Sequence, residues 1–445
     1  GKSNAPTVIA TNPPFSGQKV ESQISDKSIL KNYEFGHSFK KNDRGKFVFS
    51  GNDSDILQHQ APELLFIERC IDWLKPGGRM GIVLPKGILD NVSYEAYREW
   101  ILDRCELSGV VTLHKDTFQP DTGVRTCILF LRKPDEDKRP REDYNIFMAM
   151  SQRIGQDSKG NSVFVLDGNG NNTGILNHDL NEIADAYIDF LAGKEHQESE
   201  YIFKVKKSDI KDHVNINPQH YSPKLNAALD RVLAFDNKDN WATTTVGQLE
   251  AGIRIYIGPR WNSATIKVDN PIDTSTLVPY LTANAALELR RFTIKWLDIN
   301  KASNQQKTCI EMLKVKEGDI LISRSGTIGK VTYATKNLAE NYIVSDDLVR
   351  IRVKDDNLRA YLLAYFTSST ALSLMLLDEY GSVQQHLQPR HIQEMLIPVP
   401  DDWSQAKDMI DAGKTFMKAM EDMAEADQKI RTKGFDVLMK IQNIE

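Results

Sequence analysis

The stretch Val8-Ile9-Ala10-Thr11-Asn12-Pro13-Pro14-Phe15 decides the fold of the first part of this chain. Residues 8–11 are apolar or β-branched, which is typical of a short strand. The two prolines that follow fix φ and disfavour helical backbone at the residue before each of them. The sequence therefore predicts a short apolar strand that ends in a stiff, preorganised loop over residues 12–15.

This loop carries the groups needed for chemistry on an amino group of a nucleobase. An exocyclic amine is a poor nucleophile while its lone pair is delocalised into the ring. The side-chain oxygen of Asn12 and the carbonyl of Pro13 can accept its two N–H bonds, and Pro14 stiffens the loop that holds them. Phe15 offers a flat face on which a flipped base can stack. A simple proline-rich turn is the alternative, and four residues alone do not decide between the two.

Composition places the chain among soluble globular proteins. At 445 residues it is long enough for two or three domains, with 40% hydrophobic and 26% charged residues. No apolar run approaches the roughly 18 residues that a membrane span requires, and no signal peptide precedes the first strand. We therefore expect a cytoplasmic protein without membrane contact. The four cysteines lie far apart without a CxxC pair, which favours reduced thiols and no metal site.

The pattern that follows the loop alternates helices and strands. A polar stretch, residues 16–60, is expected to form a long loop or insertion beside the site. Strands separated by helices of this length predict an α/β unit with a mostly parallel sheet. The expected elements are a helix over 62–74, a strand over 80–85, a helix over 94–105, and strands over 108–113 and 126–131.

Residues 142–240 have a mixed pattern. The glycines of Asp167-Gly168-Asn169-Gly170-Asn171-Asn172 could belong to a phosphate-binding loop. The Asp-Gly and Asn-Gly pairs instead favour a hairpin between strands at 163–166 and 174–176. A helix is expected over 180–192, and low apolar density over 208–217 predicts a linker.

The last part of the chain is rich in strand signals and then becomes helical. We predict four segments: residues 1–140, 141–240 (a mixed extension and linker), 241–400, and a packing or coiled-coil helix within 401–445. The overall net charge is −5, but residues 243–400 carry 18 basic and 16 acidic side chains, a net of +2. A local basic face is compatible with this balance.

Three blocks of the first segment together resemble adenine-specific DNA methyltransferases, in particular the modification subunit of type I restriction systems. They are Thr11-Asn12-Pro13-Pro14-Phe15, then residues 74–79 leading into Ile82-Val83-Leu84-Pro85, and then Thr117-Phe118-Gln119-Pro120-Asp121-Thr122-Gly123-Val124-Arg125-Thr126. The resemblance implies methyl transfer from S-adenosylmethionine to the exocyclic amine of adenine. By the same resemblance, Asn12, Pro13, Pro14 and Phe15 form the catalytic loop. The residues Thr122, Gly123 and Val124 would lie against the flipped nucleotide.

Residues 241–400 resemble a target-recognition domain of type I specificity subunits. The matching stretches are 315–330, 344–351, Gly381-Ser382-Val383-Gln384-Gln385 and Ile397-Pro398-Val399-Pro400. The resemblance implies that a loop-rich β unit reads base edges, for which Arg, Lys, Asn and Gln are suited. We expect two or three of the following candidates to contact double-stranded DNA: Arg254, Arg260, Asn262, Arg290, Arg291, Arg324 and Lys330.

The chain departs from the methyltransferase pattern at its start. This class keeps its glycine-rich cofactor motif and an acidic ribose-binding residue upstream of the N-P-P-F loop, and neither precedes Asn12 here. We therefore expect an α/β fold with the C-terminal half of a Rossmann-like methyltransferase sheet, then an α+β target-recognition domain and a long C-terminal helix. Most of the S-adenosylmethionine pocket would come from residues upstream or from a partner, such as a restriction or modification subunit.

Two hypotheses remain open at this stage. In the first, the chain is the catalytic-loop and DNA-recognition part of a DNA adenine methyltransferase of a restriction–modification or related phage-defence system. In the second, it is a DNA-binding specificity module that has no catalytic activity of its own and works with a partner subunit.

Overall fold

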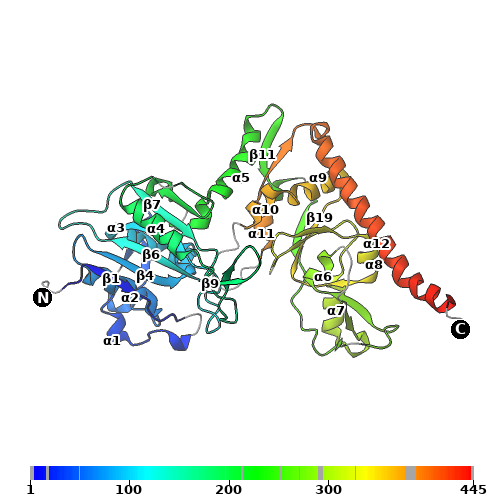
Figure 1. Ribbon diagram of the computed structural model, residues 1–445, viewed down its shortest axis with the longest axis horizontal. Coiled ribbons are helices and arrows are strands. Elements are labelled where there is room, and N and C mark those ends of the chain that lie inside the picture. The colour runs from blue at the N-terminus through cyan, green and yellow to red at the C-terminus, as the bar shows by residue number, and fades with distance from the viewer. Residues whose placement is uncertain are drawn as a thin grey trace. The chain divides into compact units, whose positions relative to one another are not determined.

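The computed structural model describes residues 5–16, 20–49, 51–195, 197–211, 214–249, 252–269, 271–288, 294–325, 327–376 and 387–441, with side chains up to residue 430. The chain forms two compact units, which meet in sequence between Asn226 and Ala227, inside helix α5. We call them unit 1 and unit 2 and describe each by itself (Figure 1).

Unit 1 is built around a six-stranded sheet in the order β1-β4-β6-β5-β7-β10. Its strands are β1 (Val8–Thr11), β4 (Arg79–Pro85), β5 (Glu106–Thr112), β6 (Thr126–Arg132), β7 (Asn145–Met150) and β10 (Ile202–Lys206). Its helices are α1 (Lys27–Leu30), α2 (Pro62–Trp73), α3 (Glu95–Arg104), α4 (Leu180–Leu191) and the start of α5 (Pro223–Leu233). Two hairpins, β2–β3 (Phe39–Lys41 and Phe47–Phe49) and β8–β9 (Phe164–Leu166 and Asn172–Leu176), stand outside the sheet.

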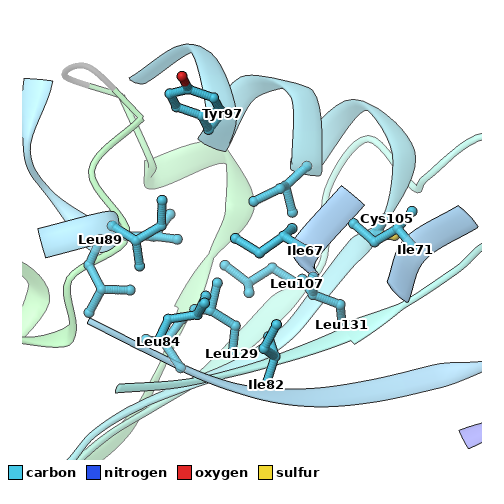
Figure 2. Packing of buried hydrophobic residues seen from close by; sticks show 14 of the residues in the cluster. Ile67, Ile71, Ile82, Leu84, Leu89, Tyr97, Cys105, Leu107, Leu129 and Leu131 are labelled. Carbon is cyan, nitrogen blue, oxygen red and sulfur yellow. The ribbon is translucent and has the colours of Figure 1, made fainter. Parts of the chain in front are cut away.

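The core of unit 1 lies between this sheet and the helices α2 and α3. Figure 2 shows Ile67 of α2 in the same cluster as Ile82 of β4 and Leu129 of β6, and all three side chains are fully buried. Apolar residues of α2 recur at helical spacing, so one face of the helix can cover the strands. Proline at its first position and a stop at Leu74 define the ends of α2 as the sequence predicted.

The α/β fold of unit 1 is confirmed, but the sheet is less parallel than we predicted. The pairs β1–β4 and β5–β7 are parallel, whereas β4–β6, β5–β6 and β7–β10 are antiparallel. The physical reason lies in the connection between β5 and β6. A parallel return needs a crossover, commonly a helix, and the loop over residues 113–125 contains none, so β6 turns back against both neighbours.

The linker expected at residues 208–217 is wrong. Ile216 is only 2% exposed, and its N–H donates to the carbonyl of Leu89. The carbonyl of Val214 accepts from Nε of Arg98. This polar stretch is therefore held to unit 1 by hydrogen bonds, which low apolar density in the sequence does not disclose. The boundaries predicted at 140 and 240 also differ from the structure, because β7 and β10 extend the same sheet.

The polar stretch over residues 16–60 is a folded insertion. It contains α1 and the β2–β3 hairpin, and it returns to the start of α2 through a bridge between Ile24 and Gln60. Leu30 and Phe35 are fully buried in the core of unit 1. The hairpin predicted around residues 167–172 is confirmed as β8–β9.

Unit 2 combines small sheets with helices, as the α+β expectation requires. One sheet has the order β12-β19-β16-β17, a second β13-β15-β14-β18, and β11 pairs with β20. The strands are β11 (Trp241–Thr245), β12 (Arg254–Ile257), β13 (Lys267–Val268), β14 (Val278–Leu281), β15 (Lys295–Leu297), β16 (Ile320–Ser323), β17 (Val331–Tyr333), β18 (Ile343–Val344), β19 (Leu348–Arg352) and β20 (Leu396–Pro400). The helices are α6 (Ala283–Leu287), α7 (Asn304–Leu313), α8 (Lys336–Asn341), α9 (Asp356–Phe366), α10 (Ser369–Met375), α11 (Pro389–Glu394) and α12 (Lys407–Ile441).

The long C-terminal helix α12 packs against α9 and α8 (Figure 1). Its buried face carries Ile410, Met420 and Ala424. Three other apolar side chains of α12, Phe416, Met423 and Ile430, are exposed, because α9 covers only one side of the helix. The predicted block 381–385 lies outside the described residues.

Candidate active site

Several loops of unit 1 meet at one edge of the six-stranded sheet. The strands β1, β4, β5 and β7 end there, and the antiparallel β6 begins there. The register fixes this, since Pro85 lies opposite Thr126, and Thr112 lies opposite both Cys127 and Met150. We call this side the carboxyl edge. In open α/β sheets, the carboxyl ends of parallel strands are where ligands bind.

The Asn12–Phe15 loop lies at this edge, directly after β1. Thr11 pairs with Ile82, so the loop runs beside the last residues of β4. Asn12 is exposed, Pro13 is buried and Phe15 is half-buried. The ring of Phe15 meets the ring of Phe118 edge-on, with centroids 6.1 Å apart. The first and third blocks of the methyltransferase resemblance are therefore in direct contact.

A carboxylate on α2 holds the far end of the loop. Glu63 is 7% exposed, and its two oxygens accept from the backbone N–H of Ser16 at 3.1 Å and from its Oγ at 3.3 Å. β1 fixes the loop at Thr11 through the ladder with β4. Because both ends are anchored, the four residues between them have little freedom to move.

The loop over residues 113–125 is also tied in place. The N–H of Thr122 donates to the carbonyl of Phe118 at 2.9 Å, and the N–H of Val124 donates to Oγ1 of Thr122 at 3.2 Å. The side-chain amide of Gln156 donates to the carbonyls of Asp116 at 2.7 Å and of Gln119 at 3.0 Å. Residues after β7 thus clamp the loop that carries Phe118.

A buried arginine fixes the segment after β4. Arg98 has no exposed surface, and its Nη1 donates to the carbonyls of Ile88 at 3.0 Å and Asn91 at 2.9 Å. Burial lowers the pKa of Arg98 to about 10, which still leaves it protonated at neutral pH. Burial likewise lowers the pKa of His114 below its usual value.

The structure thus gathers all the predicted residues of unit 1 at one edge: Asn12 to Phe15 in one loop and Thr122 to Val124 in another. Our reading of the sequence missed Glu63 and Gln156, and it assigned no role to Phe118. Phe118 could have been found as the aromatic residue of the third block. Glu63 and Gln156 have no signal in the sequence, because their roles depend on contacts with residues far away in the chain.

The candidates in unit 2 fall into different environments. Arg260, Asn262 and Lys330 are exposed beyond one end of the β12 sheet. Arg254 is exposed at the opposite end of β12, with its guanidinium 4.6 Å from the ring centre of Tyr256. Positions 290 and 291 lie outside the described residues.

Arg324 is the exception, because it is only 4% exposed. Its guanidinium donates to the carbonyls of Leu387 at 3.2 Å and Asp346 at 3.5 Å. Burial lowers the pKa of Arg324, Asp347 and Asp346 counteract this, and Arg260 adds to the lowering. The arginine holds three segments of unit 2 together, and its burial leaves little of its surface for a contact with DNA.

Two family matches cover most of the chain. Residues 2–227 match the N-6 DNA Methylase family, which is more than half of the sequence. The chain belongs to the N-6 DNA methylase family. Residues 262–424 match the type I restriction modification DNA specificity domain. The resemblances drawn from the blocks of both units are confirmed by these matches.

Curated relatives cover shorter stretches. The chain is 28% identical over 132 residues to the type I restriction enzyme EcoEI methylase subunit of Escherichia coli, which is 29% of this chain and 22% of that protein. It is 32% identical over 95 residues to the EcoKI methylase subunit of E. coli strain K12, covering 19% of this chain and 17% of that protein. The chain thus spans about a fifth of the length of the curated relatives it matches.

Solved structures share only a distant likeness with this member of the family. The type IIG restriction endonuclease BpuSI is 11% identical, with a TM-score of 0.35, over 94% of this chain and 54% of that one. The type IIL restriction–modification enzyme MmeI, solved in complex with DNA, is 10% identical, with a TM-score of 0.37, over 86% of this chain and 45% of that one.

No group of three or more His, Cys, Asp or Glu side chains in the described ranges is arranged to hold a metal ion. None of the helices in the described part of the chain combines the length and the apolar character that crossing a bilayer needs.

Proposed function

We propose that this chain supplies the target-base site and the DNA-recognition unit of an adenine-specific DNA methyltransferase in a restriction–modification or related phage-defence system. In this proposal the methyl group of S-adenosylmethionine is transferred to the exocyclic amine of an adenine flipped out of duplex DNA. Unit 2 reads the surrounding sequence through exposed residues such as Arg260, Asn262 and Lys330.

The observation that carries the proposal is the anchored Asn12–Phe15 loop at the carboxyl edge, with Phe15 against Phe118. The exposed Asn12 is available to accept a hydrogen bond from the amine of the adenine, and the Pro13 carbonyl supplies a second acceptor. Two acceptors draw the lone pair of the amine back onto nitrogen, where it can attack a methyl group. Phe15 stacks on the base, which offsets part of the few kcal/mol that flipping costs.

We infer that this chain does not form the whole cofactor pocket by itself. Among the described residues, the loops at the carboxyl edge contain no glycine-rich turn between a strand and a helix, which is the usual binding site for a cofactor of this size in such sheets. Within the described chain, β1 pairs only with β4, and its Val8 side chain is 54% exposed. We propose that further strands outside this chain pair with the open edge of β1 and complete the S-adenosylmethionine pocket.

Calorimetry and product analysis test this proposal together. We expect S-adenosylmethionine to bind to the full-length protein and not to this chain alone, with or without duplex DNA. Mass spectrometry of nucleosides should then find N6-methyladenine in DNA treated with the full-length protein. Methylated cytosine or unmodified DNA would contradict the assignment. Binding of the cofactor to this chain alone would contradict the proposal that its pocket lies elsewhere.

The main alternative is a DNA-binding specificity module that has no activity of its own and depends on a partner subunit. The specificity-domain match of residues 262–424 favours it equally. The methyltransferase proposal and this alternative predict different results when the product of a loop variant is analysed. A specificity module binds DNA in a sequence-dependent way, but its Asn12–Phe15 loop can be altered without loss of methylation by the assembled complex.

Glu63 is expected to act as a positioning residue for the catalytic loop. Glu63→Ala removes both hydrogen bonds to Ser16, so the loop loses its second anchor and samples other conformations. We expect kcat for methylation to fall about tenfold or more while KM for DNA changes little, because small misplacements of reacting groups cost rate. Steady-state kinetics with the full-length protein measure both constants.

Glu63→Gln provides the matched control. Its amide oxygen can still accept the N–H of Ser16, so kcat should recover in part. Equal losses in both variants, or a loss that follows a lower melting temperature, would indicate that Glu63 only stabilises α2. The fluorescence of 2-aminopurine at the target position reports whether base flipping itself survives.

A further inference from the structure

Apart from Gln156, the segment between β7 and α4, residues 151–179, has no part in the sites described above. It leaves the sheet at the carboxyl edge, forms the β8–β9 ribbon, and returns to α4. We call it the arm. We propose that the arm contacts duplex DNA beside the target adenine, with its ribbon in a groove. This inference rests on the proposed function and assigns unit 1 a DNA surface of its own.

Hydrogen bonds to Asp179 hold the two ends of the arm together. Asp179 is 7% exposed and accepts from the Oγ of Ser151 at 2.7 Å, from the N–H of Gln152 at 2.5 Å and from the N–H of Arg153 at 3.2 Å. The ends of the arm are therefore joined by one carboxylate. A bridge between Ile154 and His178 adds a second connection. These contacts fix the direction in which the ribbon leaves unit 1.

The arm is also joined to the loop that forms the target-base site. Gln156 donates to the carbonyls of Asp116 and Gln119, as described above. Gly160 lies so close to Pro120 that an added Cβ would be 2.8 Å from its ring. The arm is thus continuous with the loop of Phe118 and Thr122, and DNA that presents a base to this loop must pass nearby.

Beyond this attachment, most side chains of the ribbon are exposed in the described part of the chain. Leu166 is 61% exposed and Ile175 is 64% exposed, although both are large apolar side chains in strands. Phe164 and Leu176 lie opposite each other in the ladder and share one face. Val165 follows Phe164 in β8 and Ile175 precedes Leu176 in β9, so both lie on the other face. Apolar groups exposed on both faces of a ribbon mark a contact surface.

DNA is the occupant that fits this surface. The major groove admits a two-stranded β-ribbon, and apolar side chains there contact thymine methyl groups. The tip carries Asn169, whose exposed amide is suited to the edge of an adenine. The carboxylates of Asp157 and Asp167 accept hydrogen bonds from backbone N–H groups of their own turns, which engages them locally. The arm therefore suits base edges rather than phosphates.

The test compares two pairs of substitutions in the full-length protein. Leu166→Thr with Ile175→Thr removes apolar groups from the ribbon. Ile188→Thr with Leu191→Thr is the matched control on α4, where these side chains are 61% and 54% exposed. The probe is a fluorescein-labelled duplex that carries the sequence methylated by the unaltered protein. We expect the ribbon pair to weaken binding about tenfold and the control pair to leave it unchanged.

A cross-linking experiment locates the contact. Asn169→Cys, in a protein with Cys309→Ser, receives a photoactivatable group; Cys70, Cys105 and Cys127 are buried. Cross-links to DNA within one helical turn of the target adenine support the proposal. Unchanged binding by the ribbon pair, or cross-links to protein alone, overturn it and indicate a ribbon that docks on a polypeptide. If the unaltered protein binds no DNA, the proposed function itself fails, which separates the two failures.

Discussion

Asn12→Ala is expected to abolish methylation of DNA and to leave DNA binding unchanged. The alanine removes one of the two acceptors proposed for the target amine, so the lone pair stays delocalised and the methyl group is not attacked. Removal of a single preorganised partner of a reacting group typically costs a hundredfold or more in rate. We expect kcat to fall by at least about a hundredfold, measured as transfer of a radiolabelled methyl group by the full-length protein.

The stability of the protein should not change in this variant. Asn12 is exposed, and substitution at an exposed position away from caps and turns usually has little effect on the free energy of unfolding. Asn12→Asp is an informative companion, because it keeps the shape and offers only acceptor oxygens. Activity equal to that of the unaltered protein in Asn12→Ala would refute the role that we assign to this residue.

The fold of unit 1 could be predicted where the pattern is local. The helix at 62–73 has proline at its start and apolar residues at helical spacing, and its ends match the prediction within one residue. The hairpin around Asp167 follows from its turn residues alone. Order and direction in the sheet depend on which distant strands pair. The sequence gives no local sign that β6 inserts between β4 and β5.

In the candidate site, too, local features could be predicted from the sequence and long-range contacts could not. Asn12 to Phe15 could be identified because the chemistry of the loop lies within four consecutive residues. Glu63 and Gln156 act across 47 and about 40 positions of sequence, and each is an ordinary polar residue in its own segment. At Arg324, which we predicted as a DNA contact, the structure shows a feature that the sequence does not. Its charge is visible in the sequence, but its burial against backbone carbonyls is not.

The specificity-like block Glu317-Gly318-Asp319 also has a structural role that the sequence does not show. Asp319 has no exposed surface, and it accepts from Nε of Arg352 at 2.8 Å and from Nη2 at 2.7 Å. It also accepts from the N–H of Lys316 at 2.9 Å. Since Arg352 ends β19 and Asp319 precedes β16, this carboxylate joins two central strands of unit 2.

Asp319→Ala is therefore expected to lower the free energy of unfolding of unit 2 by about 3 kcal/mol. The substitution leaves the positively charged guanidinium of Arg352 without its carboxylate partner at a mostly buried position. Urea unfolding of the full-length protein measures the change.

Glu311→Ala is the matched control. It breaks an ion pair with Lys314 of the same 2.8 Å length, and the side chains of Glu311 and Lys314 are 66% and 48% exposed. An exposed pair of this kind contributes at most about 0.5 kcal/mol. Asp319→Asn keeps an acceptor oxygen and should lose less than the alanine variant. If the alanine variants at positions 311 and 319 lose equal, small amounts of unfolding free energy, the Asp319–Arg352 ion pair does not stabilise unit 2. The block Glu317-Gly318-Asp319 would then have to be explained by DNA contact.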